Sequence, residues 1–183
     1  MRQLKHHEKK LLKKVDFFSW KSDQNIREAQ IIRRYLIQDR EDYTKYNKIV
    51  GGITKLVAKL RELPVGDEQK TQLSEQLIQK LYNMGISSDT SSLASLEKLT
   101  VSSFCRRRLP IVMTKLKMSE NIKEATQFIE QGHIRVGPHC ITDPSFLVTR
   151  TFEDYVTWVD SSKIKRTIMK YNNKLDDYDL LGN

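Results

Sequence analysis

The feature that most constrains the fold of this chain is a change in hydrophobic periodicity near residue 95. Between residues 25 and 85, apolar residues recur at spacings of three and four, which predicts amphipathic helices. After residue 98, two more helical patterns are followed by short runs in which apolar and polar residues alternate, as in β-strands. Helices that precede a small separate sheet predict an α+β chain of two parts.

Three helices are expected in the first part. Residues 25–63 divide into two helices near residues 38–43, and residues 73–84 form a third helix that ends at Gly85. Helices of this length must bury their apolar stripes, so the stripes are interpreted as packing surfaces. The serine-rich segment 86–98 has no clear periodicity and is predicted to be a loop or linker.

The charge balance favours a polyanionic partner. Lysine and arginine outnumber aspartate and glutamate 32 to 23, which gives a net charge of +9. Residues 1–22 place apolar side chains among lysines and are predicted to form a basic amphipathic arm. Two interpretations stay open: the arm docks its apolar side on the body, or it lies along phosphates and orders on contact.

The cysteines and the apolar runs set further expectations. Cys105 and Cys140 lie far apart and belong to no CxxC pair, so both are expected to be reduced thiols, and no metal site or cofactor is predicted. No apolar run approaches the roughly 20 residues that span a bilayer. We therefore expect an intracellular protein without a membrane partner.

A helix that ends in glycine and leads directly into a strand marks the second part. In the segment IEQGHIRVGP, Gly132 falls where a helix C-terminus favours a left-handed residue. Strand alternation then turns Ile134 and Val136 inward, and His133 and Arg135 outward.

The rest of the sheet follows from turn signals. Residues 137–138 are Gly-Pro and turn the chain, residues 140–143 return as a short hairpin strand, and residues 154–159 supply a later strand. The predicted product is a module of two short helices packed on a small twisted sheet, with a cationic rim.

Three successive arginines at 106–108 precede the first helix of this module. Pro110 either lies in the first turn of that helix or kinks a longer helix that begins near Ser102. In the first case the arginines lie at the positive end of the helix dipole, which destabilises the helix, and an anion bound from another molecule would offset this destabilisation. Lys115 is two turns after the last arginine, so the two are expected to share a face.

The second helix of the module has a predicted start and a predicted polar face. Ser119 or Asn121 is the expected N-cap, and Glu124 stands three residues after Asn121, as in a capping box. Lys123 and Gln127 are four residues apart and point away from the apolar side.

These observations divide the chain into four segments. They are a basic arm at residues 1–22, a helical region at 23–95, the helix-and-sheet module at 96–160, and a C-terminal basic helix with an acidic tail at 161–183.

The order of the motifs resembles a known family. RRRLP, a helix, the run ATQFIEQGHIRVG and then PSFLV resemble the αL RNA-binding module of bacterial ribosomal protein S4 (S-four) and its relatives. Nearly the whole chain, from LKHHEKKLLKKVDF through REDYTKYN and LYNMGI to DYVTWVDSSKIK, is similar to the eukaryotic S4-domain protein of the U3 (U-three) small nucleolar ribonucleoprotein. A match to several motifs in the same order along the chain identifies a family more specifically than a match to the RNA-binding module alone.

The resemblance implies a non-catalytic nucleolar protein of the small-subunit processome. Such a protein binds U3 small nucleolar RNA and precursor ribosomal RNA, helps the two to pair, and associates with a scaffold protein of the same particle. The resemblance and the charge pattern together place the expected RNA contacts on the following residues: Arg106, Arg107, Arg108, Lys115, Asn121, Lys123, Gln127, His133, Arg135, Gly137 and His139.

Such a surface would hold RNA through phosphates and 2′-hydroxyls, with His133 or Tyr155 as stacking groups. His133 has a second interpretation, a local hydrogen bond at the strand start. Reversing Arg107 and Arg108 to glutamate is expected to weaken RNA binding by well over roughly tenfold without unfolding the module.

Three alternatives are retained. The first is a structural protein of the mature small ribosomal subunit, in the S4 family. The second is an enzyme, because this module is also appended to pseudouridine synthases and tyrosyl-tRNA synthetases, although the chain shows no catalytic constellation. The third is a protein adaptor that uses the helical half and the acidic tail, a role that is compatible with RNA binding.

Overall fold

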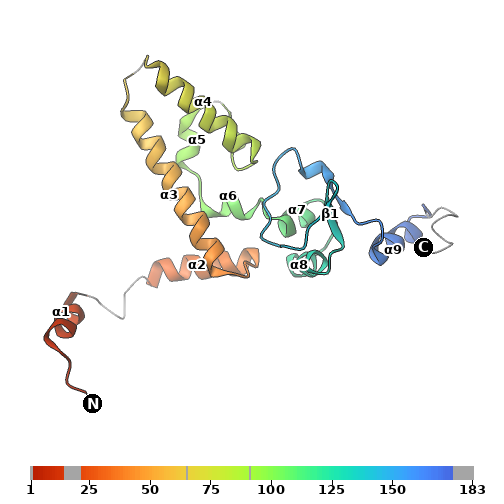
Figure 1. Ribbon diagram of the computed structural model, residues 1–183, viewed down its shortest axis with the longest axis horizontal. Helices are drawn as coiled ribbons and strands as arrows, with labels where there is room; N and C mark the ends of the chain where they lie inside the picture. Colours follow the sequence, from red (N-terminus) through yellow and green to blue (C-terminus); the bar gives the residue numbers. More distant parts are fainter. Residues whose placement is uncertain (1, 15–21, 65, 91, 175–183) are drawn as a thin grey trace.

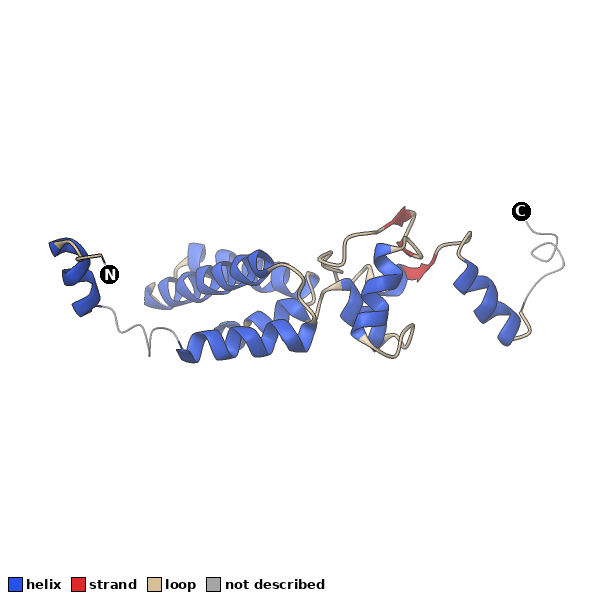
Figure 2. Cartoon of the chain, turned by 90° about the horizontal axis from the view of Figure 1, so that it is seen from below, coloured by secondary structure: helices blue, strands red, loops and turns tan. Residues whose placement is uncertain are grey.

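The structure is a computed structural model, and it describes residues 2–14, 22–64, 66–90 and 92–174. It confirms the predicted α+β class, with a helical first unit and a second unit in which two helices pack on a three-stranded sheet. Figures 1 and 2 show the two units side by side along the long axis of the molecule. The predicted arm is described from residue 2 to residue 14, where α1 (His6–Lys14) forms, and the acidic tail lies outside the described residues.

The first unit contains the three predicted helices, α2 (Ser22–Tyr35), α3 (Arg40–Glu62) and α4 (Glu68–Asn83). The division between α2 and α3 falls where the sequence predicted it, and the chain turns there through Leu36, whose φ is +47°. The predicted end of α4 is also confirmed, because Gly85 has a φ of +73°, in the left-handed region that favours glycine.

Two short helices complete the first unit, α5 (Leu93–Glu97) and α6 (Val101–Cys105). The segment 86–98 was predicted to be a loop, and this was wrong at α5, where Leu96 is fully buried. A five-residue helix shows less than two turns of periodicity, so the serines around it dominate the pattern.

The core of the first unit, the first core, is built by all of its helices from α2 to α6. In Figure 1, the chain turns back from the end of α3 into α4, α5 lies between these two helices, and α5 and α6 lie against α3. Tyr46 of α3 stacks on Phe104 of α6 with 5.8 Å between ring centroids. The buried members are Tyr35, Ile37, Tyr46, Ile53, Val57, Leu81, Ile86, Leu96, Val101, Phe104 and Cys105.

The first core extends along the chain as far as Cys105. Cys105 is fully buried in the first core, and burial raises the pKa of its thiol to about 11. Because of this raised pKa, the thiol of Cys105 stays protonated at neutral pH. Cys105 and the exposed Cys140 are both free cysteines.

The second unit packs α7 (Leu109–Lys115) and α8 (Ile122–Glu130) on a sheet of three short antiparallel strands. β1 (Ile134–Val136) is central, with β2 (His139–Cys140) on one side and β3 (Val156–Trp158) on the other. The predicted alternation of β1 is confirmed. Ile134 and Val136 are buried, and His133 and Arg135 are only half-buried.

The core of the second unit, the second core, joins both helices to the sheet and to the loop before β3. Its buried members are Leu109, Val112, Met113, Ala125, Ile129, Ile134, Val136, Val148 and Val156. The predicted strand 154–159 is shorter in the structure, because a 3-10 turn, η1 (Glu153–Tyr155), occupies its first residues. The C-terminal basic helix is α9 (Lys163–Tyr171). Within the described residues, no helix has the length and hydropathy that crossing a membrane requires.

Candidate RNA-binding surface

The arginine tract that precedes α7 turns inward rather than outward. Arg107 is 9% exposed; its Nε donates to the carbonyl of Val148 at 2.9 Å, and its Nη1 donates to Oε2 of Glu153 at 2.9 Å. Its guanidinium lies directly on Gly85, where an added Cβ would stand 2.8 Å from Cζ. Arg107 therefore holds the loop before β3 and the end of α4 against α7.

Arg108 joins the two units from the inside. It is 1% exposed, and its Nη1 donates to Oδ2 of Asp42 on α3 at 3.0 Å and to the hydroxyl of Tyr46 at 3.4 Å. A buried cation in a folded protein needs such a partner, because an unpaired one would carry a large desolvation cost.

The start of α7 resolves the question that Pro110 left open. The helix begins at Leu109 with Pro110 in its first turn, so no longer helix is kinked. The arginines before it were expected to need an anion from outside. Instead, two carboxylates of the protein, Asp42 and Glu153, supply the negative charge to Arg108 and Arg107.

Glu153 accepts two hydrogen bonds from cations. Lys115 Nζ lies 2.7 Å from its Oε1, and Arg107 Nη1 lies 2.9 Å from its Oε2. These two bonds, first that from Lys115 and then that from Arg107, hold the pKa of Glu153 below its ordinary value of 4.5. Lys115 was predicted to share a face with Arg108, but it reaches Glu153 on η1 and Arg108 reaches α3.

The depressed pKa of Glu153 leads to a pH prediction. Its stabilising effect is fully present above the ordinary glutamate pKa of 4.5 and is lost as the pH falls through the lower folded-state pKa. We therefore expect the unfolding free energy of the Glu153→Gln variant to fall less than that of the wild type across this window. At neutral pH the variant should be about 2 kcal/mol less stable, because Arg107 loses a charged partner.

Urea unfolding across a pH series that spans this window checks the prediction. Asp154→Asn, an exposed neighbour on the same turn, is the matched control and should follow the wild type. Parallel pH curves for wild type and Glu153→Gln would show that the carboxylate does not stabilise the fold.

The exposed members of the predicted set lie on three elements. Asn121 precedes α8, and Lys123 and Gln127 lie one turn apart on its exposed side. His139 lies on the edge strand β2, and Arg106 stands at the junction between the two units. These five side chains are exposed, and no partner for them occurs in the part of the chain that the structure describes. They form the candidate RNA-binding surface.

The predicted cap of α8 is only partly formed. Asn121 is the N-cap by position, but its side chain makes no capping hydrogen bond, and Glu124 instead accepts from the backbone of Glu120 at 3.2 Å. The amide of Asn121 is therefore left for another partner. The predicted stop at Gly132 is confirmed, with a φ of +74°.

His133 and Arg135 are engaged within the protein. His133 Nδ1 lies 3.1 Å from Ser162 Oγ, which is the local hydrogen bond that one of the two interpretations expected. Arg135 pairs with Asp160 at 2.6 Å. Gly137 adopts a φ of +60° in the turn, and its N–H donates to the carbonyl of Tyr155 at 3.0 Å, so it shapes the hairpin. Tyr155, the other candidate stacking group, is 60% exposed.

Sequence reasoning missed Arg150, which also links the two units. Its guanidinium lies 4.1 Å from the ring centroid of Tyr82 and donates to the carbonyls of Tyr82 and Ser87, at 3.3 and 3.2 Å. Lys117 was also missed; it is exposed directly after α7 with a φ of +59°. An unusual backbone conformation at a lysine leaves no mark in hydrophobic periodicity, so no signal in the sequence could have found it.

The fold and its two family matches define the class of this protein. Residues 3–106 match the ribosomal protein S4/S9 N-terminal domain, and residues 107–153 match the S4 domain, so the two matches meet where the structure passes from the first core to the second. The chain is an S4-domain protein related to the small-subunit ribosomal proteins.

Full-length relatives define the family more closely. The chain is 56% identical over 180 residues to the U3 small nucleolar ribonucleoprotein protein IMP3 of Saccharomyces cerevisiae, covering 98% of both chains. It is 51% identical to the human protein of the same name over 98% of both chains. The small ribosomal subunit protein uS4 of Picrophilus torridus is 26% identical over 78% of this chain and 79% of its own. The chain belongs to the family of the U3 small nucleolar ribonucleoprotein protein IMP3, which confirms the predicted family.

Proposed function

We propose that this chain is a non-catalytic RNA-binding component of the U3 small nucleolar ribonucleoprotein, and that it assists the pairing of U3 RNA with precursor ribosomal RNA. The observation that carries the proposal is identity above 50% along nearly the full length of relatives that are named as U3 ribonucleoprotein proteins. The matching relatives are named as ribonucleoprotein or ribosomal proteins, which favours a role in RNA binding rather than catalysis.

The proposed RNA contacts are the exposed side chains of the candidate surface. Lys123 and Arg106 would neutralise phosphates, and the amides of Asn121 and Gln127 would bond to sugars or phosphates. His139 adds a polar group on the edge of the sheet. Arg107 and Arg108 are not among the proposed contacts, since both are buried and pair with Glu153 and Asp42.

The proposal extends to the partners and the location, and the names of the relatives support it. We place the chain in the nucleolus, within the small-subunit processome, where it would contact U3 RNA, precursor ribosomal RNA and a scaffold protein of the particle. The alternative of a structural protein in the mature small subunit is supported less well, because the uS4 relatives are 26 to 28% identical and cover 76 to 78% of the chain.

RNA annealing kinetics test this proposal. Labelled fragments of U3 RNA and precursor ribosomal RNA are mixed with and without the protein across a salt series. We expect the protein to accelerate pairing, and the acceleration to fade as salt rises, because the counterions that lysine and arginine displace from phosphates are released less favourably into a more concentrated salt solution. Pairing at the same rate with and without bound protein would contradict the pairing role.

A further inference from the structure

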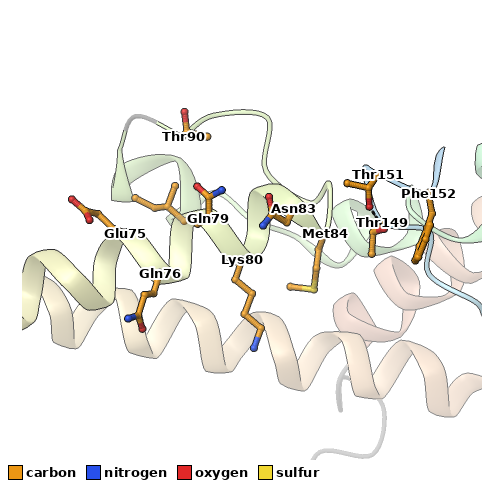
Figure 3. Close-up of a pocket in the computed structure, with 11 residues that line it drawn as sticks. Glu75, Gln76, Gln79, Lys80, Asn83, Met84, Thr90, Thr149, Thr151 and Phe152 are labelled. Carbon is orange, nitrogen blue, oxygen red and sulfur yellow. Dashed lines mark hydrogen bonds between the residues drawn. The ribbon is translucent and has the colours of Figure 1, made fainter. Parts of the chain in front are cut away.

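A groove runs along α4 where the loop of residues 149–152 approaches that helix (Figure 3). Its volume is about 1030 Å³. Ile78, Met84 and Phe152 supply its apolar part, and Phe152 is 47% exposed. The remaining lining is mostly side-chain amides and hydroxyls. An apolar floor with convergent neutral polar groups is typical of a binding groove.

The charge of the groove separates it from the candidate RNA-binding surface. Glu75 and Lys80 are the two charged side chains that line it, and their charges offset each other. A groove for a nucleic acid strand needs an excess of cations along the phosphates. Amides such as Gln79 and Asn83 can instead donate to and accept from a peptide backbone, so the lining suits a segment of protein.

A second observation concerns the buried guanidinium of Arg107. A small cavity of about 150 Å³ adjoins the groove, shares Met84 and Thr149 with it, and is lined by Arg107. Nη2 of Arg107 is buried and has no hydrogen-bond partner among the described residues, whereas Nε and Nη1 are both paired. A buried N–H without an acceptor costs stability, and a carboxylate is the acceptor that fits a guanidinium best.

We propose that this groove binds an extended segment of a partner protein that carries an aspartate or glutamate beside a bulky apolar residue. The apolar side chain packs on Met84 and Phe152, and the carboxylate reaches Nη2 of Arg107 through the small cavity. The segment's backbone bonds to the amides of α4. This site is separate from the RNA contacts, so the proposal does not depend on the RNA-binding role.

The test uses the full chain and a phage-displayed library of random linear peptides. The enriched peptides are expected to share an acidic residue beside a bulky apolar one. Binding of one such fluorescein-labelled peptide, measured by fluorescence polarisation, should weaken roughly tenfold or more in Phe152→Ala, because a central aromatic anchor is lost. Tyr171→Ala removes an 88% exposed aromatic side chain on α9 and should leave binding unchanged.

A charge variant tests the acidic residue of the peptide. Gln79→Glu places a negative charge in the groove and should weaken the peptide several-fold by repulsion, whereas Gln69→Glu, in the first turn of the same helix, should not. Three outcomes would overturn the proposal. They are no enriched peptide, enriched peptides that bind Phe152→Ala as well as wild type, and a short RNA oligonucleotide that displaces the peptide from the groove.

Discussion

Arg108→Met should destabilise the fold by about 3 kcal/mol, although Arg108 belongs to a tract of three arginines that looks like a surface patch in the sequence. Methionine keeps much of the side-chain volume but removes the buried cation of Asp42, which keeps only the longer contact of 3.5 Å to Lys45, a side chain that is 65% exposed. Urea unfolding at neutral pH measures the change. The side chain of Arg108 is 2% exposed and that of Asp42 is 15% exposed, so solvent cannot replace the lost partner.

Two further variants make this result specific to the ion pair. Lys115→Met removes a cation that is 69% exposed, and we expect a loss within about 1 kcal/mol. Adding Asp42→Asn to Arg108→Met should recover part of the loss, because the uncompensated charge is removed. An Arg108→Met variant as stable as the wild type would show that the two units are held together without this pair.

The second prediction concerns RNA affinity. Reversing Arg106 and Lys123 to glutamate should weaken binding of a U3 RNA fragment by roughly tenfold or more at physiological salt, because two phosphate contacts are lost and two repulsive charges are added. The unfolding free energy should stay close to that of the wild type, since both side chains are exposed and have no partner in the described part of the chain. A filter-binding assay measures the affinity.

Equal changes of charge elsewhere provide the control. Lys55→Glu with Lys59→Glu alters two exposed lysines of α3 and changes the net charge by the same amount. We expect this variant to retain most of the affinity. If both double variants lose affinity equally, binding follows net charge alone and the proposed surface is wrong.

Reversing Arg107 and Arg108 gives a different expectation from the one that the sequence supported. The sequence predicted weaker RNA binding without unfolding. Because both side chains are buried and paired with carboxylates, glutamate at these positions would face Glu153 and Asp42, and we now expect the protein to unfold.

The elements that could be predicted from the sequence are those whose signal is local. The long helices α3 and α4 repeat their apolar positions over several turns, and Gly85 and Gly132 mark helix ends with a conformation that favours glycine. The alternation of β1 is equally local. In contrast, α5 and α6 have five residues each, too few for a period to be visible.

The candidate site could be predicted only in part, for a related reason. The exposure of Lys123 and Gln127 follows from the apolar side of their own helix, so the sequence predicted their exposure correctly. The burial of Arg108 depends on Asp42, which lies 66 residues away in the sequence, and that of Arg107 depends on Glu153, 46 residues away. Pairings over such separations leave no trace in spacing or composition. The run of arginines therefore indicated an exposed cationic surface. In the fold, Arg107 and Arg108 instead form two internal ion pairs.

Ultraviolet crosslinking of the full chain to RNA in cells, followed by sequencing of the bound RNA and mass spectrometry of the crosslinked peptides, tests the central claim most directly. We expect reads on U3 RNA and precursor ribosomal RNA, and crosslinks on peptides around Arg106, around residues 121–127 and at His139. Reads dominated by mature small-subunit ribosomal RNA, or crosslinks confined to other surfaces, would contradict the account.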